Sequence, residues 1–248
     1  MKYPTLTSLG ESFKILKVNA MNPDEFIEAH RNYFSALIEA RKRCGDIVGK
    51  MNRSVSPAKM LVSGRKKDIE WFRKSTASLE RSPVDTEKEV DVFMEKVRKE
   101  EYPQRPSRQK AVFCYVGEIW PGSSYHISNL EEILYYGKPY VILPYNGSTY
   151  FQSNLAHDFQ LSRSYIYTKE ALHDGNMEKA KKLAREYFSD SRNDFEKMRE
   201  HFEIIVEHRG YYAFSILQWR LFLTKFKIRD GRMFGEDAMK VLKEHGIY

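Results

Sequence analysis

The chain has 248 residues, a formal net charge of +7 and an aromatic content of 14%. That aromatic content excludes a disordered chain, so we expect a packed core in one large domain or in one domain with a long extension. The sequence holds no apolar run long enough to span a membrane and no secretory signal at its start. Two cysteines, Cys44 and Cys114, fit neither a disulfide framework nor a metal site. We therefore expect a soluble cytoplasmic protein with reduced thiols and no metal.

The first hundred residues are predicted to be mostly helical. Apolar residues recur at helical spacing over 23–43, which begins after a cap at Asn22, and again over about 85–101. A further helix is predicted over 66–79. Residues 44–64 contain several glycines and a proline among basic residues, and they predict an irregular connection.

After residue 105 the pattern changes to strands separated by short helices. Strands are predicted over 111–116, 125–127, 139–143, 202–206 and 211–217, and helices over 129–136, 177–189 and 238–245. Because strands and helices do not alternate regularly, the sequence favours an α+β fold over a doubly wound α/β fold. We expect a basic helical N-terminal region, 1–84, and a second domain, 85–248.

The positive charge is concentrated between residues 41 and 74. This stretch holds eleven Lys and Arg against three acidic residues, a net charge of +8, which leaves the rest of the chain near −1. A localised basic stretch attracts a polyanion, so it predicts contact with nucleic acid, although a solvated helical face is the simple alternative. The candidate contacts are Arg65, Lys66, Lys67, Arg73 and Lys74.

Several common catalytic signatures are absent from the sequence. It has no phosphate-binding P-loop, no dinucleotide-binding glycine motif, no serine-hydrolase elbow and no zinc-protease motif. Three separated elements are more informative. These are Pro106-Ser107-Arg108 before a strand, Gly147-Ser148-Thr149-Tyr150 after a buried strand, and Glu203-Ile204-Ile205-Val206 within an apolar strand.

This order of Arg, Ser-Thr and Glu resembles that of ADP-ribosyltransferases, and in particular a divergent bacterial and phage branch. Pro106-Ser107-Arg108, Ala184-Arg185-Glu186-Tyr187-Phe188 and Glu203-Ile204-Ile205-Val206 carry the resemblance over about residues 85–215. The resemblance implies a split β-sheet domain that takes NAD as co-substrate and breaks its nicotinamide–ribose bond. In two respects the sequence departs from the family pattern, because Arg108 precedes its strand and His201 stands two residues before Glu203.

The resemblance also assigns roles to the candidate residues. Glu203 would hold the ribose 2′-hydroxyl and stabilise developing positive charge, and Arg108 would grip the phosphates or ribose. Ser148 or Thr149 would brace the glutamate or the nicotinamide ribose, and the rings of Tyr150, Phe151 and Tyr187 would stack on nicotinamide.

His126 is a secondary cofactor-binding candidate. The run Tyr125-His126-Ile127-Ser128 resembles the start of DNA-modifying and diphtheria-toxin-type ADP-ribosyltransferases, in which the histidine contacts the adenosine ribose. A structural histidine is the alternative.

The predicted function is therefore transfer of ADP-ribose from NAD to a macromolecule. The basic stretch favours RNA or single-stranded DNA as the acceptor, and a protein acceptor is the alternative. The family resemblance implies a toxin-like role in conflict between bacteria and phage, with a neutralising antitoxin protein as partner. An NAD glycohydrolase and a non-catalytic nucleic-acid-binding protein are the rival hypotheses.

Overall fold

A computed structural model describes residues 21–53, 58–65, 72–76, 87–119, 125–127, 129–155, 162–189, 191–229 and 232–248. Over these residues the chain combines nine α-helices with a nine-stranded open sheet in which every strand pair is antiparallel. The α+β class predicted from the sequence is confirmed.

The helices precede, interrupt and follow the strands along the chain. They are α2 (Pro23–Ala29), α3 (Arg31–Arg43), α4 (Gly45–Arg53), α5 (Lys88–Glu101), α6 (Leu130–Tyr136), α7 (Arg163–His173), α8 (Met177–Ser189), α9 (Ile216–Lys225) and α10 (Glu236–Glu244). Two 3₁₀ turns, η1 (Arg108–Lys110) and η2 (Phe195–Lys197), precede β3 and β8.

The sheet has the strand order β2-β9-β5-β1-β3-β8-β6-β7, with β4 paired to β3. The strands are β1 (Ala58–Arg65), β2 (Phe72–Thr76), β3 (Ala111–Ile119), β4 (Tyr125–Ile127), β5 (Lys138–Pro144), β6 (Thr149–Ser153), β7 (Ser191–Arg192), β8 (Ile204–Glu207) and β9 (Gly210–Ser215). Strand β3 pairs with β8 through residues 111–114 and with β1 and β4 through its second half.

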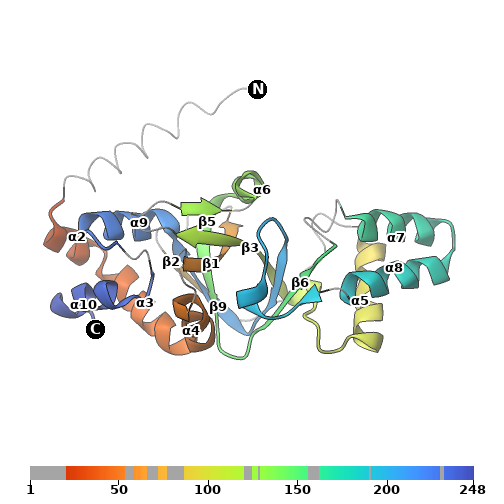
Figure 1. Cartoon of the computed structure of the whole chain (residues 1–248), viewed down its shortest axis with the longest axis horizontal. Coiled ribbons are helices and arrows are strands. Elements are labelled where there is room, and N and C mark those ends of the chain that lie inside the picture. The colour runs from red at the N-terminus through yellow and green to blue at the C-terminus, as the bar shows by residue number, and fades with distance from the viewer. Residues whose placement is uncertain are drawn as a thin grey trace, which may run out of the picture.

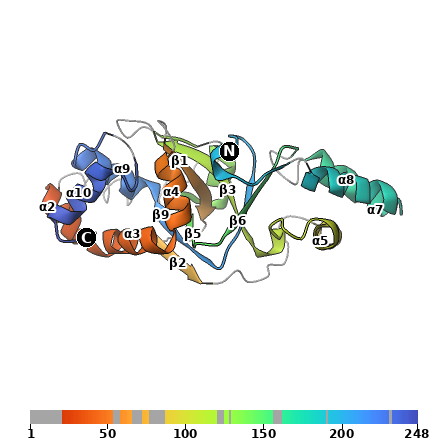
Figure 2. The same ribbon diagram turned by 60° about the horizontal axis from the view of Figure 1, so that its bottom comes forward.

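Two hydrophobic cores pack against different parts of this sheet. The larger core joins the strands around β5 and β9 to helices α2, α3, α4, α6, α9 and α10. The smaller core joins α5, α7 and α8 to residues of β3, β6 and β8. Helices α5, α7 and α8 accordingly gather at one end of the molecule, and α2, α3, α9 and α10 at the other (Figure 1). The rotated view in Figure 2 shows the same separation.

The N-terminal elements differ from the sequence prediction. The single helix predicted over 23–43 is divided at His30 into α2 and α3. Residues 45–53 and 58–65 form α4 and β1 instead of an irregular connection, and residues 72–76 form strand β2 where a helix was predicted. Strand β1 lies between β5 and β3, so residues before 85 supply a central strand of the sheet. The proposed boundary between 1–84 and 85–248 therefore divides one sheet.

The C-terminal elements agree better with the sequence. Helix α8 has the predicted bounds, and helices α5, α6 and α10 and strands β3, β4, β5, β8 and β9 form within a few residues of theirs. The predicted strand over 202–206 begins at Ile204, which leaves Glu203 just outside it. Helices α7 and α9 were not predicted.

Candidate functional site

Arg108, Tyr187 and Glu203 form one cluster between the sheet and the α5/α7/α8 helices. Nη1 of Arg108 lies 2.5 Å from Oε1 of Glu203 and donates a hydrogen bond to the Tyr187 hydroxyl at 3.4 Å. The side chains of Arg108 and Glu203 are only 11% and 10% exposed. Fold topology thus joins residues that are 95 and 79 positions apart in sequence.

Helix α5 fixes the Pro106-Ser107-Arg108 segment through its buried polar face. The Ser107 hydroxyl donates to Oε2 of Glu95 (3.1 Å), and the Ser107 amide donates to Oε2 of Glu207 (2.8 Å). Arg98 in turn forms two hydrogen bonds with Glu95 (2.8 and 2.9 Å) and donates to the Arg105 carbonyl (2.8 Å). Each of these polar groups is paired, so the main chain just before Arg108 is held on both sides.

The electrostatic setting keeps Arg108 charged. Burial would lower the pKa of its guanidinium, but the charge of Glu203, with smaller contributions from Tyr187 and from the hydrogen bond to Glu203, raises that pKa above the ordinary value. The guanidinium also lies over the ring of Phe113, 4.7 Å from its centroid. Burial raises the pKa of the Tyr187 phenol, which therefore stays protonated at neutral pH.

Asp91 contributes a second carboxylate beside the cluster. It lies on α5 one turn before Glu95 and is 9% exposed. The Asp91 carboxylate also raises the pKa of Arg108, by less than Glu203 and Tyr187 do. Oδ1 of Asp91 is buried and has no hydrogen-bond partner among the described residues. A buried carboxylate oxygen without a donor is costly, so this atom is an acceptor that a ligand could satisfy.

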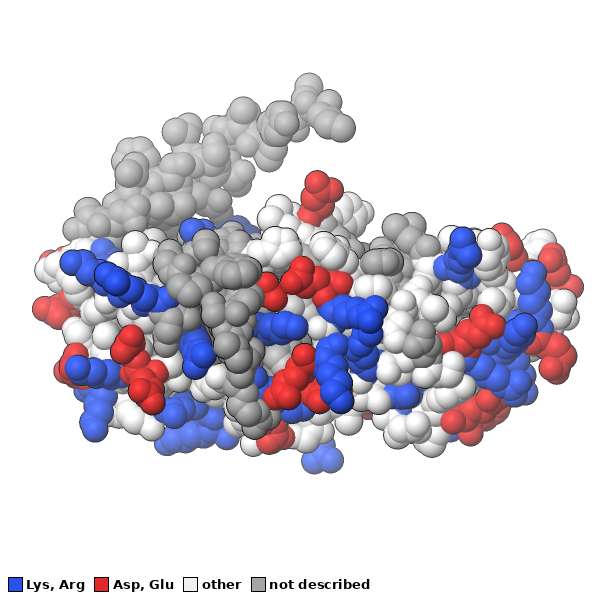
Figure 3. All heavy atoms as spheres, in the orientation of Figure 1, with Lys and Arg blue, Asp and Glu red and all other residues white. Residues whose placement is uncertain are grey.

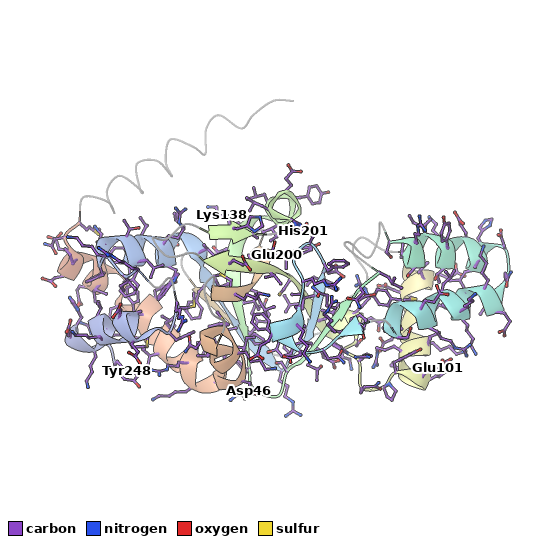
Figure 4. All side chains as sticks on the ribbon, viewed as in Figure 1. Asp46, Glu101, Lys138, Glu200, His201 and Tyr248 are labelled. Carbon is purple, nitrogen blue, oxygen red and sulfur yellow. The ribbon has the colours of Figure 1, made fainter. Side chains whose placement is uncertain are left out.

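Glu203 ends a short irregular segment, residues 199–203, that leads into β8. The segment is hydrogen-bonded to the side chains of Gln152 on β6 and of Asn129, just before α6. Figure 4 labels two of its residues, Glu200 and His201, which lie between the two groups of helices. The main chain just before Glu203 is thus held by hydrogen bonds to side chains, and the pairing of β8 begins one residue later.

The predicted cofactor contacts Ser148, Thr149 and Tyr150 lie farther along the strands. Ser148 is a turn residue whose hydroxyl donates to the carbonyl of Tyr145 (2.6 Å). Thr149 pairs with Glu207, four positions after Glu203. Tyr150 is buried in the larger core, where burial raises its pKa. No contact joins these three side chains to the Arg108–Glu203 pair. Among the predicted aromatic contacts, Tyr187 joins the pair and Phe151 packs against Tyr187, with ring centroids 5.4 Å apart.

His126 belongs to a second polar group on the sheet. In the strand register it lies opposite Glu118 on β3, which also faces Lys59 on β1. Nδ1 of His126 is 4.0 Å from Oε2 of Glu200. Burial raises the pKa of Glu118, the nearby carboxylate of Glu200 raises it further, and Lys59 and His126 oppose the rise. His126 thus approaches a residue near the start of the segment that ends at Glu203.

The basic candidates are only partly described. Arg65 ends β1, and Arg73 and Lys74 belong to β2, where the predicted helix was wrong. Lys66 and Lys67 lie outside the described residues. On the face shown in Figure 3, the described Lys and Arg side chains are interspersed with Asp and Glu. Nucleic-acid contact by this stretch stays a prediction.

No protein-family model, curated protein or solved structure matches the chain. Within the described ranges, no group of three or more His, Cys, Asp and Glu side chains could hold a metal ion. In the same part of the chain, no helix combines the length and apolar character needed to cross a bilayer. Cys44 and Cys114 are both buried and do not form a disulfide with each other.

Sequence reasoning missed Gln152, Asp91 and Glu95. For the α5 residues a signal exists, because Asp91, Glu95 and Arg98 recur at helical spacing on one face of α5, next to the apolar face that forms the smaller core. Gln152 carries no comparable local signal.

Proposed function

We propose that the chain is an NAD-dependent ADP-ribosyltransferase that modifies a macromolecule. The observation that supports this most is the contact between Arg108, Tyr187 and Glu203, which come from the three motifs of the family resemblance. A forked cation, a phenol and a carboxylate in one partly buried cluster suit a substrate that carries phosphates and hydroxyls.

The residues have complementary roles in this proposal. NAD, when bound, supplies the nicotinamide–ribose bond that breaks. The Glu203 carboxylate accepts a hydrogen bond from a ribose hydroxyl and stabilises positive charge as it develops on the sugar. Arg108 exchanges its contact with Glu203 for a phosphate oxygen, which leaves the carboxylate available to the ribose. Oδ1 of Asp91, which has no hydrogen-bond partner among the described residues, accepts from a hydroxyl or amide donor of the same substrate.

The acceptor in this proposal is RNA or single-stranded DNA. The net charge of +8 between residues 41 and 74 supports it, because a localised basic stretch binds a phosphate backbone irrespective of sequence. A toxin-like role with a neutralising protein partner is part of the same proposal and is supported by the family resemblance.

The test combines the full-length protein, labelled NAD and a cell extract divided into RNA, DNA and protein fractions. We expect label in the RNA or DNA fraction, and Glu203→Gln should reduce its rate by a factor of about 10²–10³. The matched control is Glu101→Gln, which removes an exposed glutamate that pairs with Arg185 at 2.7 Å (Figure 4). This control should retain the wild-type rate.

Each other outcome has a defined meaning. Label in the protein fraction would identify a protein as the acceptor. Release of nicotinamide without label in any fraction would indicate an NAD glycohydrolase. Binding of nucleic acid without any turnover of NAD would refute the proposed enzymatic activity and would support a non-catalytic nucleic-acid-binding protein. Melting curves of both variants are needed, because breaking a buried ion pair can cost about 3–5 kcal/mol of stability.

A further inference from the structure

The side chain of Gln152 forms an unusually complete set of hydrogen bonds with the 199–203 segment. Its Oε1 accepts from the Arg199 amide (2.7 Å). Its Nε2 donates to the carbonyls of Arg199 (2.9 Å) and Phe202 (3.2 Å). Gln152 is fully buried, so water does not compete for these bonds.

These bonds replace the strand pairing that the segment lacks. Strand β8 begins at Ile204, so residues 199–203 lie before the ladder that β8 forms with β3. A primary amide presents a donor and an acceptor side by side, as a neighbouring strand would. Gln152 itself is fixed on β6, which pairs with both β7 and β8. The orientation of the main chain up to Phe202 is therefore set by a rigid element.

The side chain of Asn129 makes a second contact with the segment. His201 has a φ of 65° and Asn129 a φ of 55°, both in the left-handed region that costs energy for residues with a Cβ. The Asn129 amide donates to the His201 carbonyl at 3.2 Å, and its Oδ1 lies 3.4 Å from Nδ1 of His201. The side chain of Asn129 thus holds His201, which lies two positions before Glu203, in its left-handed conformation.

We infer that Gln152 is a positioning residue that holds the 199–203 segment so that the Glu203 carboxylate stays against Arg108. Glu203 directly follows Phe202, whose carbonyl Gln152 binds, so loss of this bond removes one restraint on the main chain next to Glu203. Only the catalytic consequence of this inference rests on the proposed function.

The first test measures the energetic coupling between Arg108 and Glu203 without any substrate. A double-mutant cycle of Arg108→Lys and Glu203→Gln on the free energy of unfolding gives this coupling. We expect it to fall by at least half when the cycle is repeated in a Gln152→Met background. Gln152→Asn, which keeps the amide but is one methylene shorter, takes its place if Gln152→Met does not fold. An unchanged coupling would overturn the inference.

A matched control separates this effect from loss of any glutamine amide. Gln218 lies on α9, and its Oε1 is buried without a hydrogen-bond partner among the described residues. Gln218→Met should leave the Arg108–Glu203 coupling at its wild-type value. If Gln218→Met lowered this coupling by a similar amount, the inference would also be overturned. The effect of Gln152→Met would then reflect general destabilisation and not the loss of its contacts with the 199–203 segment.

NAD turnover provides the second readout. A residue that only orients the carboxylate should lower kcat by a factor of ten or more in Gln152→Met and leave the KM for NAD within twofold. A kcat that stays within twofold of wild type would contradict the catalytic role. If the wild-type protein turns over no NAD, the proposed function fails, while the coupling measurement still decides whether Gln152 positions Glu203.

Discussion

Two arginine–glutamate pairs show how surroundings decide what an ion pair does. Arg108 and Glu203 are each about nine-tenths buried, whereas the side chains of Arg185 and Glu101 are 47% and 28% exposed. Removing one partner of a buried pair leaves the other charge without solvation, and removing one partner of an exposed pair does not. Breaking the first pair should therefore cost much more stability than breaking the second, although both have good geometry.

At the residue scale, His245 predicts a pH dependence of stability. Its Nδ1 lies 2.9 Å from the Val241 carbonyl and its Nε2 2.9 Å from Oδ1 of Asp24. The bond to Val241 raises the pKa of His245, burial opposes the rise, and Asp24 adds to it. A raised folded-state pKa stabilises the protein fully below the ordinary value near 6.5, and this stabilisation is lost as pH rises through the folded value.

We therefore expect His245→Gln to lower the free energy of unfolding more at about pH 5.5, where the imidazole is charged, than at about pH 9, where it is neutral. The difference between the two pH values should be at most about 1 kcal/mol, because the Asp24 carboxylate is 87% exposed and solvent screens its charge. Urea titrations of wild type and variant at both pH values measure it. A larger loss at the higher pH would contradict the assigned ion pair.

At the element scale, the contact between β1 and β3 depends on Gly117. A Cβ at this position would lie 2.4 Å from Cγ2 of Val62 and 3.2 Å from Cγ of Met60, both on β1. Gly117→Ala should therefore lower the free energy of unfolding by about 1–3 kcal/mol through overpacking. A Cβ added at Gly49 on α4 would meet no atom within 4 Å. Because glycine destabilises a helix interior relative to alanine, Gly49→Ala should raise the free energy of unfolding by about 0.5–1 kcal/mol. Urea unfolding of both variants measures these two changes in the free energy of unfolding. Equal changes in the two variants would refute the prediction.

The elements also show how far the sequence alone could predict the fold. Helix α8 and strand β5 carry their own signals, since the one has apolar residues at helical spacing and the other is a continuous apolar run. Strand β2 does not. It pairs with β9, in which Phe214 lies opposite Phe72, so its conformation depends on a partner 142 residues later. Local propensity cannot report such a contact.

The candidate site divides in the same way. Arg108, Tyr187 and Glu203 lie in recognisable local motifs, so the sequence could propose each of them separately. Their meeting depends on the register of β3 against β8, which only the fold supplies. Gln152 acts through the main chain of residues 47 and 50 positions away, and many other side chains at its position would fit the same strand pattern.

At the scale of the whole molecule, the sheet joins the two halves of the chain. Strand β1 pairs with β3 through five residues and with β5 through four, and it lies in the middle of the strand order. Leu61 and Val62 are fully buried in the larger core. A fragment of residues 85–248 would keep both neighbours of β1 but lose the strand that connects them.

We expect this fragment to fail to fold alone. Without β1, strands β3 and β5 present unpaired backbone groups and an apolar face to solvent, which promotes aggregation. The measurement is a thermal or urea transition of the purified 85–248 fragment beside the full chain, with addition of a separate 1–84 fragment as the control. Recovery of a cooperative transition on mixing would show that β1 completes the sheet. A cooperative transition of the 85–248 fragment by itself would instead establish it as an independent domain. The packing of Leu61 and Val62 on β1 would then not be required for residues 85–248 to fold.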